Sequence, residues 1–184
     1  MQKKDKLRKK YKSIRQKKYF DIKPNFFDPL IKLIKARYGK KNIYLSGYYP
    51  SSYEVNVLRL FETGIKDKIK ILLPVANKNN SMNFYQWNCR EILKINRFGF
   101  LEPFVQLNKI IPNIMLVPLL SYDNKKNRLG YGKGFYDQYL KKYLRKNNTI
   151  LTIGIAFSFQ RYRDLPTSNN DVKLNFVLTE KGIF

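Results

Sequence analysis

The sequence predicts an α/β fold with three layers, α/β/α, around a mostly parallel, Rossmann-like sheet. Short apolar runs alternate along the chain with longer stretches of helical periodicity, which is the pattern of strands joined by crossover helices. One of these runs, residues 114–122 (IMLVPLLSY), is nearly all apolar, as expected for a central strand that is covered on both faces. The 184 residues contain no repeat and no linker, so we expect a single domain over residues 1–184.

The first part of the chain is expected to form three helices and one strand. A helix is predicted at about residues 3–19, where apolar side chains share one face. A second helical stretch covers 24–38, because a glycine follows it directly. The aromatic and apolar run at 42–49 predicts a short strand. A turn at 50–52 then leads into a third helix, whose first turn carries Glu54.

The second part of the chain is expected to supply most of the sheet. Apolar runs rich in β-branched and aromatic residues predict strands at 69–75, 82–87, 114–122, 149–157 and 175–179. A polar turn at 77–81 separates the first two of these strands. A glycine-containing loop follows the third strand, and a helix is predicted after it at 135–144.

The formal charge of +24, from 37 Lys and Arg against 13 Asp and Glu, allows two interpretations. A basic protein can bind a polyanion such as RNA, DNA or the ribosome. A genome rich in A and T would give the same bias, since Lys, Asn, Ile, Tyr and Phe are abundant together. We favour the second interpretation because the lysines are scattered along the whole chain. In either case anionic small substrates would be attracted.

The chain has no histidine and a single cysteine, Cys89. These counts exclude an internal disulfide, the usual catalytic triads and His-ligated metal sites. A metal would therefore need oxygen ligands, which indicates magnesium rather than zinc. No apolar run approaches the ~20 residues of a membrane span, and the basic N-terminus lacks the apolar core of a secretory signal. We expect a cytoplasmic protein without a membrane partner, and a buried Cys89.

The run NRLGYGKGFYD at residues 127–137 is the strongest candidate for a functional loop. In parallel sheets ligands bind beyond the carboxyl ends of the strands, and this run follows such a strand. Its alternating glycines, Gly130, Gly132 and Gly134, let backbone N–H groups face an anion. The helix that begins near Phe135 would add its positive N-terminal end.

Charged side chains in the same run suit a phosphorylated ligand. Arg128 can contact a phosphoryl group through two N–H groups, and Lys133 adds a point charge. Asp137 is a hard oxygen ligand for a magnesium ion that bridges phosphates. The spacing matches neither the Walker A motif nor the dinucleotide fingerprint. A tight strand-to-helix connection is the structural alternative, but the combination favours anion binding.

The run from Arg128 to Asp137, preceded by residues 117–119 and Asp123, resembles the signature of the 5-formyltetrahydrofolate cyclo-ligase family, also called 5,10-methenyltetrahydrofolate synthetase. The resemblance covers essentially the whole chain. Weaker landmarks in the right order are Lys4 with Arg8, Tyr49-Pro50 with Glu54-Val55, Phe98-Gly99 with Glu102-Pro103, and Asn170-Asp171 with Thr179-Glu180.

The resemblance implies an ATP-driven closure of 5-formyltetrahydrofolate, with or without a polyglutamate tail, to 5,10-methenyltetrahydrofolate. ADP and phosphate would be released through a phosphorylated formyl intermediate. Such a reaction needs no protein nucleophile, so positioning and charge neutralisation would carry the catalysis. We expect a monomer that uses Mg²⁺ and does not bind nucleic acid as its function.

The resemblance also implies roles for individual residues. Arg128 and Lys133 would be catalytic, Tyr49 and Glu54 would bind the folate, and Asp137 and Asp171 would hold the metal. ATP would contact two segments, Lys4, Asp5, Lys6, Leu7 and Arg8 in the first helix, and Arg128, Leu129, Gly130, Tyr131, Gly132, Lys133, Gly134, Phe135 and Tyr136 in the loop.

Structural interpretations stand beside these roles. Without the resemblance, Glu54 is an acid that complements the start of a helix. Lys4 and Arg8 form a solvated basic face, and Asp171 is a turn residue. Trp87 belongs to the core rather than to a ligand platform. The chain departs from many family members by Asn170 in place of His, and Tyr131 stands where some have Arg or Met.

Two other functional classes remain open from the sequence. A basic α/β module could bind RNA or ribosomes through lysines and stacked aromatic rings. The glycine loop and the acids Glu54, Asp137 and Asp171 would then have no purpose. A different nucleotide or sugar-phosphate enzyme on a similar fold would keep the loop but change the substrate.

Overall fold

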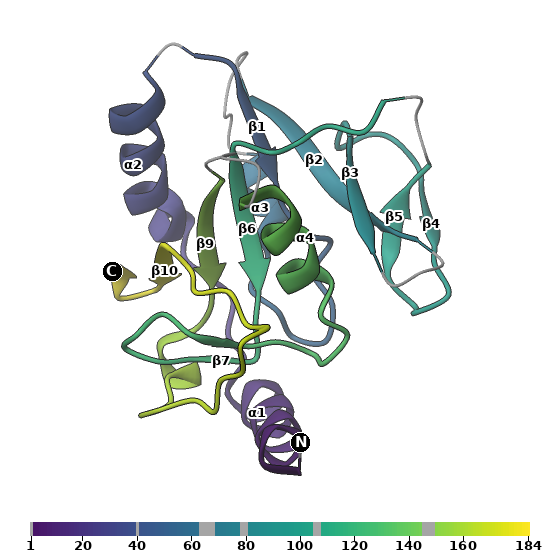
Figure 1. Cartoon of the computed structure of the whole chain (residues 1–184). Helices are drawn as coiled ribbons and strands as arrows, with labels where there is room; N and C mark the ends of the chain where they lie inside the picture. The colour runs from purple at the N-terminus through teal and green to yellow at the C-terminus, as the bar shows by residue number, and fades with distance from the viewer. Residues whose placement is uncertain (1, 40, 63–68, 78–80, 105–107, 145–149) are drawn as a thin grey trace.

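A computed structural model describes residues 2–39, 41–62, 69–77, 81–104, 108–144 and 150–184. Its centre is a seven-stranded sheet in the order β11-β10-β9-β6-β1-β2-β3 (Figure 1). Neighbours from β10 to β2 pair in parallel, and only the two edge strands are antiparallel. The strands are β1 (Ile43–Ser46), β2 (Ile69–Ala76), β3 (Met82–Gln86), β6 (Ile114–Pro118), β9 (Leu151–Ile155), β10 (Phe176–Thr179) and β11 (Gly182–Ile183).

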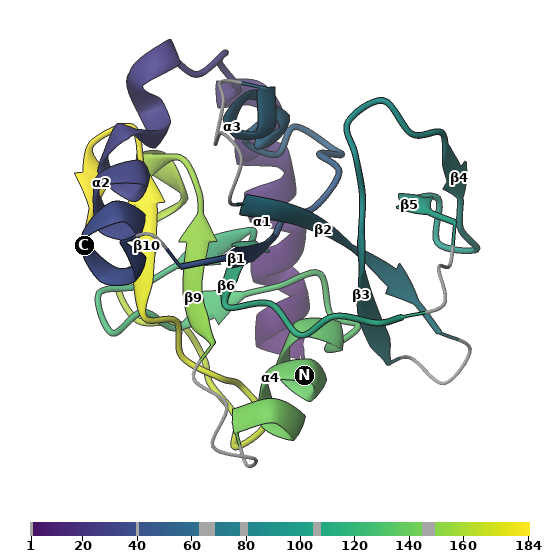
Figure 2. The ribbon, with the colours of Figure 1, turned by 90° about the horizontal axis from the view of Figure 1, so that it is seen from above.

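Helices cover both faces of this sheet, which confirms the expected three-layer α/β/α fold. Figure 2 shows α2 and α3 on one side and α4 on the other. The helices are α1 (Gln2–Lys18), α2 (Asp28–Tyr38), α3 (Leu58–Glu62) and α4 (Phe135–Leu144), with 3-10 turns η1 (Pro24–Phe27) and η2 (Ser158–Gln160). α4 has the predicted bounds, and α1 differs from its prediction by one residue at each end.

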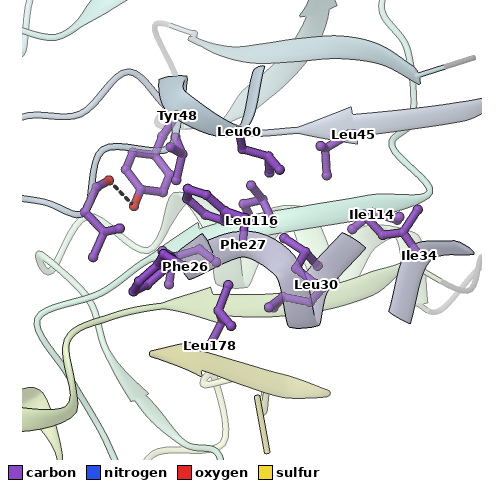
Figure 3. Packing of buried hydrophobic residues seen from close by; sticks show 14 of the residues in the cluster. Phe26, Phe27, Leu30, Ile34, Leu45, Tyr48, Leu60, Ile114, Leu116 and Leu178 are labelled. Carbon is purple, nitrogen blue, oxygen red and sulfur yellow. Dashed lines mark hydrogen bonds between the residues drawn. The ribbon is translucent and has the colours of Figure 1, made fainter. Parts of the chain in front are cut away.

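The central strand β6 shows how the residue pattern produces the two layers. Ile114 and Leu116 pack against Leu30 of α2 on one face (Figure 3). Met115 and Val117 point the other way and pack against Leu140 of α4. Successive side chains of a strand alternate between faces, so an unbroken apolar run is what a strand between two helical layers requires.

α1 lies outside these layers, beyond the carboxyl ends of β6 and β9 (Figure 1). Its buried residues Leu7 and Tyr11 pack with Leu120, Leu129 and Leu165, which come from the segments that follow the sheet strands. The first helix therefore closes the edge of the sheet at which α/β proteins bind ligands.

Two small hairpins complete the fold. One pairs β4 (Leu93–Ile95) with β5 (Leu101–Pro103), and the sequence pattern did not predict it. The other pairs β7 (Ser121–Tyr122) with β8 (Arg128–Leu129). The predicted strand 114–122 is therefore wrong beyond Pro118. The carbonyls of Leu119 and Leu120 accept hydrogen bonds from the Gln160 side chain instead of a neighbouring strand.

Three further predictions need correction or fall outside the described residues. Glu54 does not lie in a helix, because α3 begins at Leu58 and Ser52 and Tyr53 adopt positive φ angles of 48° and 65°. Helical residues have negative φ angles. Cys89 is exposed rather than buried, since it lies in the turn after β3. Residue 149 of the predicted strand 149–157 and most of the turn 77–81 are outside the described residues.

Candidate active site

A cleft of about 650 Å³ lies at the carboxyl edge of the sheet. The strand ends at Ala76 of β2 and Pro118 of β6 form its floor, and α1, the β4–β5 hairpin and the glycine loop form its walls. Most of the predicted site residues line this one cleft: Lys4, Arg8, Tyr49, Glu54, Arg128, Leu129, Gly130, Tyr131, Gly132, Lys133, Gly134, Phe135, Tyr136, Asp137 and Asp171. Segments up to 167 positions apart in sequence thus converge.

The cationic side of the cleft comes from α1. The Lys4 ammonium lies 2.6 Å from a carboxylate oxygen of Asp171. Arg8 Nε donates to the carbonyl of Gly130 at 3.0 Å, and its Nη1 pairs with Asp5 at 2.6 Å. Through these contacts α1 binds both Asp171 and the glycine loop.

The rest of the segment from Lys4 to Arg8 does not line the cleft. Leu7 is buried in the core under α1, and Lys6 is exposed. Asp5 supports Arg8 through the ion pair rather than facing the cavity. A helix presents residues three or four apart on one side, so Lys4 and Arg8 share the cleft face and the residues between them do not.

The glycine loop needs glycine at two of its positions. Gly132 and Gly134 have φ angles of 101° and 72°, a region that L side chains rarely adopt. A Cβ at Gly132 would also lie 3.2 Å from the Arg8 guanidinium carbon. The loop then enters α4 at Phe135, so the N-terminus of that helix faces the cleft as expected.

Arg128 and Asp137 form the most buried ion pair of the site. Arg128 Nη2 lies 2.7 Å from Asp137 Oδ1, and the Arg128 side chain is only 4% exposed. The same oxygen accepts the backbone N–H of Val172 at 2.9 Å, while Arg128 Nη1 donates to the Val172 carbonyl. These contacts fix Arg128 and attach the segment beside Asp171 to the start of α4.

Besides its ion pair with Lys4, the Asp171 carboxylate accepts a hydrogen bond within a turn. Its Oδ2 accepts the backbone N–H of Ser168 at 2.6 Å. Although burial opposes the effect, the hydrogen bonds from Lys4 and Ser168 lower the pKa of Asp171. The carboxylate is therefore ionised at neutral pH, and the turn and the predicted ligand role are compatible.

Lys133 faces the β4–β5 hairpin across the cleft. Its ammonium lies 5.6 Å from the centre of the Phe98 ring, and Phe98 packs edge-on against Phe135 at 5.5 Å. Within the part of the chain that the structure describes, no carboxylate lies within salt-bridge distance of Lys133. Its charge is therefore available to an anion.

Glu54 also lines the cleft and is only 8% exposed. Its Oε2 accepts the backbone N–H of Ser51 at 2.9 Å, and its Oε1 accepts the Tyr131 hydroxyl. Burial raises the pKa of Glu54, and the Tyr131 hydrogen bond and the charge of Arg15 act against that rise. Tyr49 also lines the cleft. The arrangement offers a buried carboxylate to N–H donors of a ligand.

The sequence analysis missed several residues of the cleft. Lys12 lines it four positions after Arg8, and this spacing was visible in the sequence. Asn96, Phe100 and Leu101 come from the β4–β5 hairpin, for which no pattern was found. Trp87 lines a smaller neighbouring cavity of about 410 Å³ instead, and it is buried as the core interpretation expected.

The described part of the chain shows neither a cluster of metal-ligating side chains nor a membrane-spanning helix. Within the described ranges, no group of three or more His, Cys, Asp or Glu side chains gathers as a metal site. No helix among these residues is long and apolar enough to cross a membrane.

Comparisons with known proteins agree on one family. The family model described as the 5-formyltetrahydrofolate cyclo-ligase family matches residues 1–180. A 5-formyltetrahydrofolate cyclo-ligase of Haemophilus influenzae is 30% identical over 154 residues, 80% of each chain. A probable 5-formyltetrahydrofolate cyclo-ligase of Schizosaccharomyces pombe is 30% identical over 157 residues, 78% of this chain and 76% of that one.

Solved structures give the same answer. The NMR structure of Aquifex aeolicus 5,10-methenyltetrahydrofolate synthetase superposes with a TM-score of 0.72 at 27% identity, covering 98% of this chain and 91% of that one. A 5,10-methenyltetrahydrofolate synthetase from Mycoplasma pneumoniae shares the fold with a TM-score of 0.69 at 24% identity, over 95% and 97% of the two chains.

Proposed function

This chain belongs to the 5-formyltetrahydrofolate cyclo-ligase family, and on that premise we propose which of its residues perform each part of the reaction. Members of the family are ligases that convert 5-formyltetrahydrofolate to 5,10-methenyltetrahydrofolate with ATP. The observation that carries the proposal is that one cleft gathers most of the predicted site residues. It brings the glycine loop, the α1 cations and the buried Glu54 together within about 650 Å³, a size that suits small organic ligands.

ATP binds on the side formed by α1 and the glycine loop. Lys4 and Arg8 contact its phosphates, together with the backbone N–H groups of residues 128–136. Arg128 and Lys133 neutralise the charge that moves on the transferred phosphoryl group. Arg128 is held by the carboxylate of Asp137 and the carbonyl of Val172, so its position is preorganised before the substrate arrives.

The folate binds on the other side, with its pterin edge toward Glu54 and Tyr49. A pterin presents N–H donors on its pyrimidine edge, and a carboxylate can accept two of them. Glu54 is buried and anchored by the Ser51 backbone, so an unpaired N–H or carboxylate here would be costly. This pairing orients the formyl group toward the phosphate side of the cleft.

The reaction then proceeds in two displacements. The formyl oxygen attacks the γ-phosphorus, the bond to the bridging oxygen breaks, and ADP leaves. N10 of the folate next attacks the formyl carbon, the C–O bond to the phosphoryl group breaks, and phosphate leaves. Loss of the N10 proton gives the methenyl product. No step uses a protein nucleophile, which agrees with the lack of histidine and the peripheral place of Cys89.

Asp137 and Asp171 are the residues that would hold Mg²⁺. Among the described residues, all hydrogen bonds to each carboxylate end on one oxygen, Oδ1 of Asp137 and Oδ2 of Asp171, so the second oxygen of each can serve as a ligand. Mg²⁺ usually takes one or two carboxylates besides phosphate oxygens and water, which fits this pair. When bound, the ion would neutralise charge between the β- and γ-phosphates.

The chain is further proposed to act as a cytoplasmic monomer on folates that carry a polyglutamate tail or none. The single cysteine is exposed and would stay reduced in that compartment. The net charge of +24 would favour anionic tails. Gel filtration and a comparison of mono- and polyglutamylated substrates test these points.

The assignment is tested by following methenyltetrahydrofolate formation from 5-formyltetrahydrofolate by absorbance. Product should appear only when Mg-ATP is present, and chelation of the metal should stop the reaction until Mg²⁺ is restored. Lys133→Ala should lower the rate strongly, whereas Lys142→Ala, an exposed lysine on α4, should not. Equal product without nucleotide, or none under any condition, would contradict the proposal.

A further inference from the structure

Tyr131 connects the glycine loop to Glu54. Its backbone lies between Gly130 and Gly132 in the glycine loop, whereas its hydroxyl donates to Oε1 of Glu54, 77 positions away in sequence. The loop is the proposed nucleotide site and Glu54 is the proposed folate anchor. One side chain thus connects two sites that bind different substrates.

Two cations of α1, three positions apart and therefore on one side of that helix, lie close to the Tyr131 ring. The Arg15 guanidinium carbon lies 5.5 Å from its centre, and the Lys12 ammonium lies 5.9 Å from it. Arg15 is 1% exposed and donates to the carbonyls of Ser52, at 2.7 Å, and Leu119, at 3.3 Å. Arg15 is therefore fixed from both sides, and it gives the ring a defined resting place beside Glu54.

The backbone on either side of Tyr131 is tied to Arg8, a proposed ATP ligand. Arg8 Nε donates to the Gly130 carbonyl at 3.0 Å, and the Arg8 guanidinium packs against Gly132. A phosphate that engages Arg8 and the loop amides must therefore set the position of Tyr131, because both neighbours of that residue are parts of the phosphate site.

We propose that Tyr131 is a positioning residue that couples the two substrates, so that a nucleotide bound at the glycine loop orients Glu54 for the folate through the Tyr131 hydroxyl. The proposal rests on the proposed function of the cleft. Each oxygen of a carboxylate can accept two hydrogen bonds, so Tyr131 and a pterin N–H can share Glu54. Coupling between two binding sites is reciprocal, and each ligand should tighten the other by the same factor.

The groups around Glu54 support this arrangement. Tyr131 stays a donor at all working pH values, because burial and the Glu54 charge raise its pKa well above 10. Tyr48 and Tyr136 also face Glu54, and burial keeps both phenols protonated by raising their pKa values. The positive charge of Arg15 opposes the rise in the pKa of Glu54 that burial causes.

The test measures the affinity for 5-formyltetrahydrofolate by calorimetry, with and without the non-hydrolysable ATP analogue adenylyl imidodiphosphate. In the unmodified protein the analogue should tighten folate binding about fivefold or more. Tyr131→Phe removes only the hydroxyl, and the ratio should fall to within about twofold of one. The matched control is Tyr53→Phe, one residue from Glu54 but outside the cleft lining, which should keep the full ratio.

A double-mutant cycle separates a positioning role from a merely structural one. If Tyr131 acts through Glu54, the double variant Tyr131→Phe/Glu54→Gln should lose no more folate affinity than Glu54→Gln alone. An analogue effect of one in the unmodified protein, or a full effect in Tyr131→Phe, would overturn the coupling. Both results require measurable folate binding; a protein that binds neither ligand would overturn the proposed function instead.

Discussion

At the scale of single residues, Glu54 is the side chain on which the proposed recognition of the folate depends most. Glu54→Gln replaces one acceptor oxygen by a donor group, so one pterin N–H loses its partner. Truncating one partner of such a buried pair costs ~2–4 kcal/mol, which corresponds to a rise of about 30-fold or more in the folate KM. The KM for ATP should change little. Steady-state kinetics with each substrate varied in turn will decide, and a loss confined to ATP would contradict the placement of the folate.

The same carboxylate also makes stability depend on pH. Burial raises the pKa of Glu54 above its ordinary value of 4.5, so the native chain binds this proton more tightly than the unfolded chain. The free energy of unfolding relative to Glu54→Gln should therefore be highest below pH 4.5 and should fall as the pH rises through the native pKa. Urea unfolding of both proteins between pH 4 and pH 7, at about one pH unit per step, measures this difference. An opposite slope would show that Glu54 is stabilised as an anion.

Asp123 has a structural role that the resemblance alone did not reveal. Its fully buried carboxylate accepts the backbone N–H groups of Lys125, Asn127 and Leu165 and the side-chain amide of Asn127. Asp123→Ala would leave these donors unpaired and should lower the free energy of unfolding by about 3 kcal/mol. Asp164→Ala, which breaks only the exposed pair with Lys125, should change stability little. Equal effects in both variants would contradict the role of burial.

At the scale of elements, α1 is the helix that would complete the proposed nucleotide site. Lys4→Ala and Arg8→Ala remove the cations that face the cleft, and both variants should bind ATP more weakly while unfolding within about 0.5–1 kcal/mol of the parent. Lys9→Ala changes an exposed residue of the same helix and should bind ATP normally. Calorimetric titration with ATP distinguishes the three variants. Unchanged affinity in the first two would mean that α1 is only a solvated basic helix.

The elements show where sequence patterns were sufficient and where they were not. Helical periodicity and unbroken apolar runs predicted α2, α4 and the central strands, because each of these elements buries apolar side chains. The helix predicted at Glu54 is wrong because Ser52 and Tyr53 adopt positive φ angles. The residue types at these two positions did not predict such angles. The β4–β5 hairpin is held by Glu102, whose carboxylate accepts the Ala76 N–H and the Asn96 amide. That long-range contact has no local signal.

The candidate site shows the same difference between local sequence patterns and long-range contacts. The glycine loop carries its glycines and charged residues in adjacent positions, so the sequence alone predicted that this loop lines a cleft, and phosphate binding by its groups stays a prediction. The ion pair between Lys4 and Asp171 and the hydrogen bond between Tyr131 and Glu54 join segments that only the fold brings together. The residue types indicated that these side chains can form ion pairs and hydrogen bonds. Which groups they contact depends on tertiary packing.

For the whole molecule, the net charge of +24 should act mainly on anionic substrates. Raising the salt concentration should increase the apparent KM for ATP and folate modestly, because only a few partly buried contacts are screened. A nucleic-acid-binding function would instead show a steep linear fall of log affinity with log salt. Kinetics and RNA-binding assays at about 50 to 200 mM salt compare the two. Tight, steeply salt-dependent RNA binding would indicate that the charge serves a second partner.

The contact between Lys4 and Asp171 has a consequence for biosynthesis. The ribosome makes α1 before its partners, which include the Asp171 carboxylate, 167 positions after Lys4, and the buried residues Leu120, Leu129 and Leu165. The apolar face of α1 therefore stays uncovered until these later segments have been made. At ~5–20 residues per second, the 167 positions between Lys4 and Asp171 take roughly 8 to 33 seconds to synthesise. A ligand that needs both residues can stabilise the nascent protein only after residue 171 has been made, so a chain interrupted before it gains no protection from ATP or folate.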